Sequence, residues 1–214
     1  MCRESGVLLR YTEPGALCQL TAGEGSWLLI SLTLFLESVT FNESAAGAGL
    51  VISESASRMK YSKKAKSLTS PDGSLRFWLP MTLGTKGFTS GRHYWEVQVG
   101  LRNDWDIGVA LETVDKSDKV LVKTMNGFYS IGKMGFDYRI NDSPCKTLNL
   151  CPRPRIVGVY LDYEEGRVSF YDVNEKLHIH SFIGESFTGK LFPYFYLYSG
   201  KITAYQVSGS NNHN

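Results

Sequence analysis

Apolar and polar residues alternate along many short runs of the second part of the chain. In residues 93–99, Trp95, Val97 and Val99 share one face, and residues 105–111 repeat the pattern around a second tryptophan. This period of two is typical of half-buried β-strands, because successive side chains point to opposite faces. The strands predicted on this basis are 50–53, 74–79, 93–99, 105–111, 127–131, 156–162, 167–173, 178–182, 191–197 and 201–207.

Turn residues separate these runs and suggest how neighbouring strands connect. The turn dipeptides are Asp72-Gly73, Ser90-Gly91, Asn126-Gly127, Glu165-Gly166 and Ser199-Gly200. Since the connection 100–104 is short, we expect 93–99 and 105–111 to form an antiparallel hairpin with both tryptophans turned to one core. Strand 156–162 is apolar on both faces, which predicts a central strand that forms a hairpin with 167–173. The pattern predicts an all-β sandwich or barrel.

Charge and cysteine content narrow the classes of function. Lys+Arg 23 and Asp+Glu 21 give a net charge of +2 over 214 residues, whereas nucleic-acid binders usually carry a basic stripe. The four cysteines, at positions 2, 18, 145 and 151, form no C-x-x-C pair. We expect free thiols in a cytosolic compartment, although a Cys145–Cys151 bridge is compatible with the sequence.

The uncharged run 25–36 is shorter than the roughly 20 residues of a transmembrane helix, so we expect no membrane insertion by this chain.

Several sequence blocks occur in the order found in one known family. They are FTSGRHYWEVQVG (88–100), WDIGVAL (105–111), NGFYSI (126–131), VGVYLDYEEGRVSFYDV (157–173) and FTGKLFPYFYLYSG (187–200). Together they resemble the PRY-SPRY domain, the C-terminal recognition domain of many tripartite-motif ubiquitin ligases and butyrophilins. Two of the three signature blocks are intact, at 95–97 and 161–164, while Phe41-Asn42-Glu43 replaces the usual Leu-Asp-Pro. The resemblance implies a bent two-sheet antiparallel β-sandwich of the SPRY, concanavalin-like jelly-roll type.

The resemblance also sets the expected domain limits. It places a PRY-SPRY domain at 38–207, with the PRY part at about 38–88 and the SPRY part at about 89–207. Residues 1–37 form an atypical N-terminal segment, and the polar tail 208–214 is expected to be disordered. The cysteines lack the spacing of a RING domain. The resemblance therefore implies a chain that is not an enzyme, because ubiquitin-ligase activity would need a RING domain absent from this chain.

Histidine and carboxylate pairs in the sequence do not predict a catalytic site. His93 and Glu96 are three positions apart on a strand, so their side chains leave opposite faces, whereas acid-base catalysis needs converging groups. The neighbouring carboxylates 164–165 splay apart in a turn, unlike glycosidase carboxylates, which face each other. His178 and His180 share a face at a spacing that can bind metal, but the sequence supplies no third ligand. We expect no metal and no cofactor.

Candidate partner-binding residues lie in the loops between predicted strands, since a rigid sandwich tolerates variable loops. The basic run 58–66 has five positive charges and no acid. It is expected to be a solvated edge loop, and the alternative is a basic patch that attracts an acidic protein or a phosphate. By resemblance, 132–136 and 194–196 line the family's binding surface, although Gly132 and Met134 stand where relatives often have bulky aromatics. The candidates are Lys63, Lys64, Arg102, Asn103, Asp104, Tyr129, Lys133, Met134, Phe136, Tyr194 and Tyr196, with loops expected at 54–66, 100–104, 132–143 and 174–187.

The sequence supports one leading function and leaves two alternatives open. The leading hypothesis is a cytoplasmic module that binds a protein ligand through its variable loops, in substrate or pathogen-component recognition in ubiquitin-linked innate immunity. A second hypothesis is a butyrophilin-like intracellular sensor of phosphorylated small molecules, suggested by the basic run with Arg92, His93 and Arg102. A third, a lectin or hydrolase on the same sandwich, lacks converging carboxylates and a calcium-type cluster of Asp and Asn.

Overall fold

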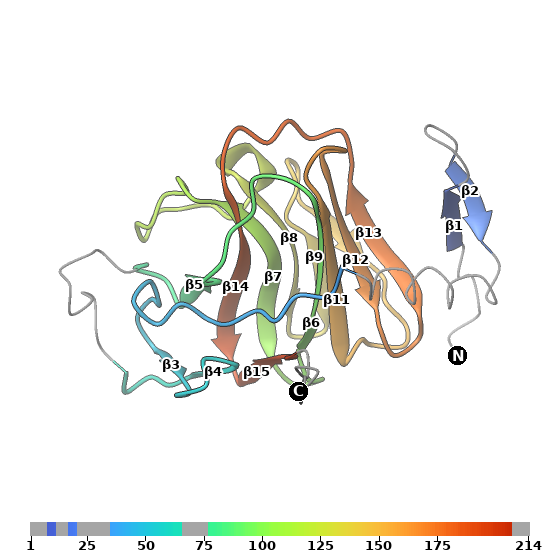
Figure 1. The fold of residues 1–214 in the computed structure, drawn as a ribbon. Coiled ribbons are helices and arrows are strands. Elements are labelled where there is room, and N and C mark those ends of the chain that lie inside the picture. Colours follow the sequence, from blue (N-terminus) through green and yellow to red (C-terminus); the bar gives the residue numbers. More distant parts are fainter. Residues whose placement is uncertain (1–7, 12–16, 21–34, 66–76, 207–214) are drawn as a thin grey trace, which may run out of the picture.

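Two antiparallel β-sheets packed face to face form the body of the protein (Figure 1). The computed structural model describes residues 8–11, 17–20, 35–65 and 77–206. The strands are β1 Leu8–Tyr11, β2 Leu17–Leu20, β3 Leu50–Ile52, β4 Arg58–Tyr61, β5 Met81–Leu83, β6 Arg92–Gln98, β7 Asp104–Leu111, β8 Phe128–Met134, β9 Asp137–Ile140, β10 Lys146–Leu148, β11 Ile156–Asp162, β12 Arg167–Asp172, β13 Leu177–Phe182, β14 Leu191–Ser199 and β15 Lys201–Ala204. The 3-10 helix η2 spans Thr124–Asn126.

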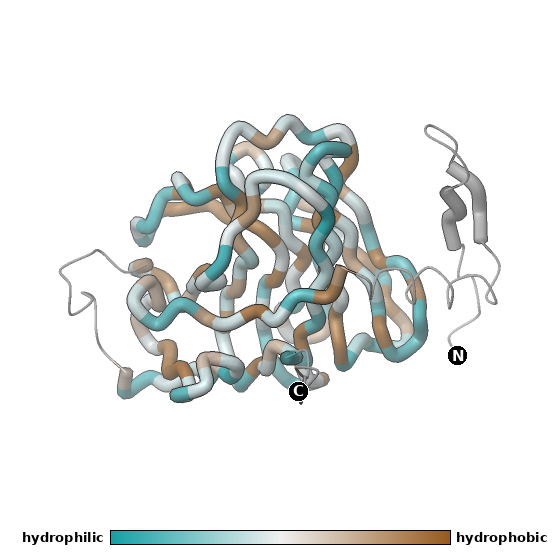
Figure 2. The backbone as a smooth tube through the Cα atoms, in the orientation of Figure 1, coloured by the Kyte–Doolittle hydropathy of each residue, from teal (hydrophilic) through white to brown (hydrophobic). Residues whose placement is uncertain are grey.

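The strand order separates the chain into two layers. One sheet has the order β10-β9-β8-β7-β14-β5, and the other has the order β13-β12-β11-β6-β15-β4-β3. Hydrophobic and hydrophilic positions alternate along the strands (Figure 2), as the sequence predicts, and one hydrophobic core fills the space between the sheets. This arrangement confirms the predicted two-sheet antiparallel sandwich. Within the described part of the chain, no helix has the length and apolar content needed to cross a bilayer.

The predicted hairpin between 93–99 and 105–111 is wrong. Strand β6 pairs with β11 and β15, whereas β7 pairs with β8 and β14 in the opposite sheet. The connection crosses from one sheet to the other, so Trp95 and Trp105 meet as parts of the same core from facing layers. Both tryptophans are fully buried. The alternation therefore identified the buried faces correctly but assigned the wrong pairing partner.

Strand β11 is central and pairs with β12 in the hairpin that the sequence predicts. Its outer face is covered as well, by a small cluster in which Phe35 and Leu36 pack against three buried tyrosines. Gly158 makes room for this layer, since a β-carbon there would come within 2.4 Å of the Tyr94 hydroxyl oxygen. The segment just before residue 38 is thus attached to the outer face of the seven-stranded sheet.

Several elements differ from the prediction. Strand β4 occupies the first part of the basic run that was expected to be a loop, and β1, β2, β5, β9 and β10 were not predicted. Of the predicted strand 74–79, residues 74–76 lie outside the described residues and 77–79 are not a strand. Cys145 is a free, exposed thiol, but Cys151 is disulfide-bonded. The expectation of free thiols is therefore wrong at Cys151, and the Cys145–Cys151 bridge is not formed.

Candidate partner-binding site

The turns of the sandwich gather at two opposite ends. We call one of them the loop end, defined by residues 100–104, 133–136, 151–155 and 199–200; it lies at the lower edge of Figure 1 near β15. The Lys133 amine donates a hydrogen bond to the Asn103 carbonyl at 2.9 Å, and the backbone N–H of Val99 donates to the Arg155 carbonyl at 2.9 Å. These contacts bring turns that are far apart in the sequence onto one surface.

The opposite end contains 112–127, 163–166 and 183–190. It is closed by backbone hydrogen bonds from Glu112 to Lys190 at 2.9 Å and from Glu185 to Gly166 at 3.0 Å. The expected loop 174–187 contains β13, so its two halves lie at different ends of the sandwich. The expected loop 132–143 is mostly strand, because β8 continues to Met134 and β9 begins at Asp137.

Asp104 organises the loop end. Its carboxylate accepts hydrogen bonds from the Gly135 N–H at 2.8 Å and from the Ser199 hydroxyl at 3.1 Å. Burial disfavours the charged form, but these hydrogen bonds and the nearby Lys133 amine outweigh it and hold the pKa of Asp104 below its usual value. Asp104 therefore joins three turns as an ionised acceptor. Lys133 is only 2% exposed, so it supports the 100–103 turn from inside and is corrected from a contact residue to a positioning residue.

The tip of the β8–β9 hairpin is the most exposed apolar feature of the loop end. Phe136 is 78% exposed and Met134 is 44% exposed. Gly135 between them has a φ of +62°, a left-handed conformation that glycine adopts without strain, and this turn lifts Phe136 away from the sheet. The Arg153 guanidinium lies 4.9 Å from the centre of the Phe136 ring. Phenylalanine, methionine and arginine are all enriched at protein interfaces relative to the rest of the surface.

A buried polar network lies beside this hairpin on the outer face of the six-stranded sheet. Asp106 is fully buried, accepts a hydrogen bond from the Tyr198 hydroxyl at 3.0 Å and pairs with the Arg139 guanidinium at 3.2 Å. Burial raises the pKa of Asp106, although Arg139 opposes the shift. A β-carbon at Gly132 would lie 1.7 Å from the Asp106 carboxylate, so glycine is required at this position for the network to form.

Sequence reasoning missed Asp106, Arg139 and Arg153. The signal that was available for the network is Gly132 itself, since a glycine inside a strand often marks the close approach of another group. Arg153 follows a proline in a loop and carried no signal of its own. The network and Arg153 extend the candidate surface to both sides of the hairpin tip.

Three tyrosines that the sequence predicts as partner contacts are buried, so this prediction is corrected. Tyr194 is fully buried in a second apolar cluster on the outer face of the six-stranded sheet, where Phe77 and Phe128 also lie, and Tyr196 packs there too. Tyr129 points into the core between the sheets. Tyr194 and Tyr196 are buried because residues 77–79 and 112–123 cover the outer face of the six-stranded sheet. The strand pattern cannot reveal this cover. We therefore remove these tyrosines from the contact surface.

The remaining predicted residues are exposed, except Asn103 and Asp104, which are half-buried. Lys63 and Lys64 follow β4 and face solvent, and Arg102 projects from the β6–β7 turn next to Asn103. The Asn103 side chain donates hydrogen bonds to the carbonyls of Val99 and Lys201, so it stabilises the turn that presents Arg102. The structure brings Asn103, Asp104, Met134 and Phe136 together at the loop end.

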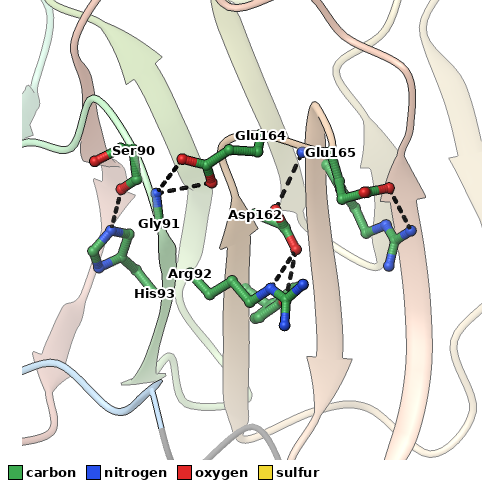
Figure 3. A network of polar contacts seen from close by, with 9 residues as sticks. Ser90, Gly91, Arg92, His93, Asp162, Glu164 and Glu165 are labelled. Atoms are coloured by element: carbon green, nitrogen blue, oxygen red, sulfur yellow. Dashed lines mark hydrogen bonds and ion pairs between the residues drawn. The ribbon is translucent and has the colours of Figure 1, made fainter.

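A polar network at the opposite end engages residues that had suggested other functions (Figure 3). The Arg92 guanidinium pairs with Asp162 at 2.9 Å, and the Gly91 N–H donates to Glu164 at 2.9 Å. His93 lies 2.9 Å from a carboxylate oxygen of Glu37, whereas Glu96 accepts a hydrogen bond from Tyr94 at 2.8 Å. His93 and Glu96 therefore face different partners, and Arg92 and His93 already contact carboxylates.

Both histidines of β13 contact other side chains of the protein. His178 lies 2.7 Å from the Ser181 hydroxyl and contacts the Tyr171 ring edge-on. Burial lowers the pKa of His178 to about 4, and it also lowers the pKa of His180. Across the residues that the structure describes, no three side chains of His, Cys, Asp or Glu gather into a group that could hold a metal ion. A β-bulge in the pairing of β12 with β13 separates the two rings: His178 lies with Tyr171 and Ser181 on the outer face, whereas His180 contacts Phe182 of the core. The predicted shared face of His178 and His180 is therefore wrong.

Comparisons with known proteins agree with this geometry. The chain is 38% identical over 161 residues to "Nuclear factor 7, brain" of Xenopus laevis, which covers 74% of this chain and 26% of the relative. It is 39% identical over 170 residues to human "Butyrophilin subfamily 1 member A1", covering 78% and 32%, and 36% identical over 164 residues to mouse "E3 ubiquitin-protein ligase TRIM38", covering 75% and 35%. The chain thus spans about a third or less of the length of these relatives.

Solved structures and a family model identify the fold and the family. The TRIM65 PSpry domain superposes with a TM-score of 0.73 at 20% identity, covering 84% of this chain and 95% of that one, and stonustoxin superposes with a TM-score of 0.67 at 22% identity, covering 81% and 29%. At these identities the likeness shows the shared fold. The model of the SPRY domain matches residues 92–208, more than half of the chain. The chain therefore belongs to the SPRY domain family.

Proposed function

We propose that this chain is a non-catalytic recognition module that binds a protein partner through its loop end. The observation that carries the proposal is the exposed hairpin tip, where Phe136 and Met134 present apolar surface beside the Arg153 guanidinium. Exposed aromatic and arginine side chains are enriched at the centres of protein interfaces. Membership of the SPRY family, whose domains act as protein-interaction modules, supports this assignment.

The rigidity of the loop end favours binding. The Gly135 N–H and the Ser199 hydroxyl are both held by Asp104, and the Arg139–Asp106 pair holds the next strand. A surface whose turns are already ordered loses less conformational entropy on association. These contacts anchor the backbone of the hairpin tip and the strand that follows it, which supports a role of the tip as the anchor of the interface.

The biological setting belongs to the same proposal. One relative bears the name E3 ubiquitin-protein ligase, and other relatives are a zinc finger protein and butyrophilins. We place the recognition event in the cytoplasm, where the module would select substrates for ubiquitination or bind a pathogen component in innate immune signalling. The alternative function is a butyrophilin-like sensor of phosphorylated small molecules. Two of the three residues that suggested it already contact carboxylates, since Arg92 pairs with Asp162 and His93 with Glu37.

Substituting Phe136 tests the proposal. We expect Phe136→Ala to weaken capture of the partner at least about tenfold, because truncating a central interface aromatic costs more than about 1.4 kcal/mol. Affinity purification of the tagged chain with quantitative mass spectrometry measures the loss. Phe136 is exposed, so the variant should unfold at the temperature of the wild type.

The matched control is Met125→Ala. Met125 is 75% exposed on η2 at the opposite end, so it removes a comparable apolar side chain from another surface. The proposal predicts that the partners retained by Met125→Ala are those lost by Phe136→Ala. Identical partner lists for the wild type and Phe136→Ala would show that the hairpin tip is not the contact.

A further inference from the structure

A groove runs along the outer face of the seven-stranded sheet near its β3 edge. It has a volume of about 810 Å³ and is lined by strands β3, β4 and β15, by Gln98 of β6 and by the turn 100–103. Lys60 and Arg58 of β4 face outward, as do Lys201 and Thr203 of β15. In the register of these strands Lys60 lies opposite Lys201 and Arg58 opposite Thr203. Their neighbours Met59 and Ile202 point into the core. The groove is therefore built on a rigid ladder, with the β6–β7 turn as one wall.

The groove is basic. Its lining contains four cations, Arg58, Lys60, Arg102 and Lys201, and no aspartate or glutamate. All four are exposed, and within the described ranges none of them makes an ion pair. Like charges placed directly opposite each other on paired strands, as in Lys60 and Lys201, repel and destabilise the sheet. A negatively charged ligand would relieve this repulsion.

The spacing of the cations fits an extended chain. Arg58 and Lys60 are two residues apart on β4 and point to the same face, so their α-carbons are separated by roughly 6.8 Å. Acidic residues at alternate positions of an extended peptide repeat at the same distance. The four cations are spread over two strands and a turn and stay exposed, which suits several separate carboxylates better than one phosphate group. Exposed Val51 and Leu101 add apolar surface to the same groove.

We propose that this groove binds an extended acidic segment of a partner protein, with carboxylates at alternate positions and an apolar side chain against Val51 and Leu101. The proposal goes beyond the loop-end interface and does not depend on the hairpin tip. The two surfaces meet at the β6–β7 turn, where Arg102 faces the groove and Asp104 holds the hairpin. An acidic segment bound here would lie next to a partner that occupies the loop end.

The test uses a defined probe and the full chain. The probe is a fluorescein-labelled peptide with glutamates at alternate positions and one leucine, and its counterpart carries glutamines in place of the glutamates. Fluorescence anisotropy should show saturable binding of the acidic peptide that weakens as salt is added. The variant Lys60→Gln with Lys201→Gln should bind about tenfold more weakly, since two charge pairs are lost. Arg102→Gln, which lies on a turn outside the ladder, should weaken binding in the same direction.

The matched control is Lys116→Gln with Lys119→Gln. It makes the same change in net charge with two exposed lysines at the opposite end of β7, and it should leave binding unchanged. Equal loss in both double variants, or equal binding of the glutamine peptide, would overturn the proposal by showing that binding is not specific to groove and charge. Calorimetry with inorganic pyrophosphate provides the last arm. Tighter binding of pyrophosphate than of the acidic peptide would assign the groove to a phosphorylated small molecule instead.

Discussion

Replacing Asp106 with alanine is expected to lower the free energy of unfolding by about 3 kcal/mol. Removing one partner of a buried ion pair leaves the other without compensation and costs roughly 3–5 kcal/mol. The lower end applies because the Arg139 side chain is 30% exposed and can regain some water. The Tyr198 hydroxyl also loses its acceptor. Urea unfolding of the wild type and the variant, followed by tryptophan fluorescence, measures the change.

Two further variants identify the cause of this loss. Asp106→Asn keeps an acceptor for Tyr198 and a similar shape, so it should destabilise the domain less than alanine does. Arg139→Met removes the guanidinium, and combining it with Asp106→Ala should recover part of the stability, because no unpaired charge remains. Strictly additive losses in the double variant would contradict a coupled ion pair. An unchanged stability in Asp106→Ala would show that the network contributes nothing to the folded state.

Acid is expected to destabilise the domain through His178. Its pKa is lowered from 6.5 to about 4 by burial, so between these values the unfolded chain binds a proton that the folded chain does not. The stability is therefore complete above pH 6.5 and falls as the pH drops towards 4. A shift of this size corresponds to about 3 kcal/mol, since each unit of pKa is worth about 1.4 kcal/mol.

The variant His178→Gln isolates this contribution. Glutamine can keep a hydrogen bond to Ser181, whose hydroxyl lies 2.7 Å from the His178 ring, and it does not titrate. The stability of the variant should fall less steeply than that of the wild type between pH 6.5 and pH 4. Parallel stability curves in urea unfolding, or an NMR titration of His178 near its usual pKa, would refute the assignment.

The buried faces of the strands and the β11–β12 hairpin could be predicted from sequence, whereas the partners of β6 and β7 could not. Alternation shows that Trp95 and Trp105 must be buried, and both are. A short connection is equally compatible with a hairpin and with a crossing between two sheets, because either arrangement buries both tryptophans. The choice depends on the pairing of β6 with β11 and β15 and of β7 with β8 and β14, which are contacts between strands far apart in sequence.

Burial of the outer faces of the two sheets could not be predicted from the alternation of apolar and polar residues either. Tyr194 and Tyr94 lie on the faces turned away from the central core, and the sequence therefore suggests exposure. In the structure, residues 77–79 and 112–123 cover Tyr194, and Phe35 with Leu36 covers Tyr94. These covers come from irregular segments, for which strand periodicity has no signal.

Only part of the candidate site could be predicted, because some of its residues are brought together by contacts that strand periodicity does not show. The turn 100–104 and the residues Met134 and Phe136 meet at the loop end as the sequence suggested. Arg139, by contrast, becomes part of the site only because the carboxylate of Asp106 lies over Gly132 in the neighbouring strand. Strand β4 was missed because a run of positive charges is more often a solvated loop than a strand, yet here Arg58 and Lys60 point outward while Met59 faces the core.

Hydrogen exchange of the chain with and without its captured partner tests the loop-end interface most directly. Mass spectrometry of the exchanged peptides reports which backbone amides are protected in the complex. We predict slower exchange in residues 100–104 and 133–139 on binding, with no change in 112–127 and 183–190. Protection confined to 112–127 and 183–190 would contradict the account and move the binding surface to the opposite end of the sandwich.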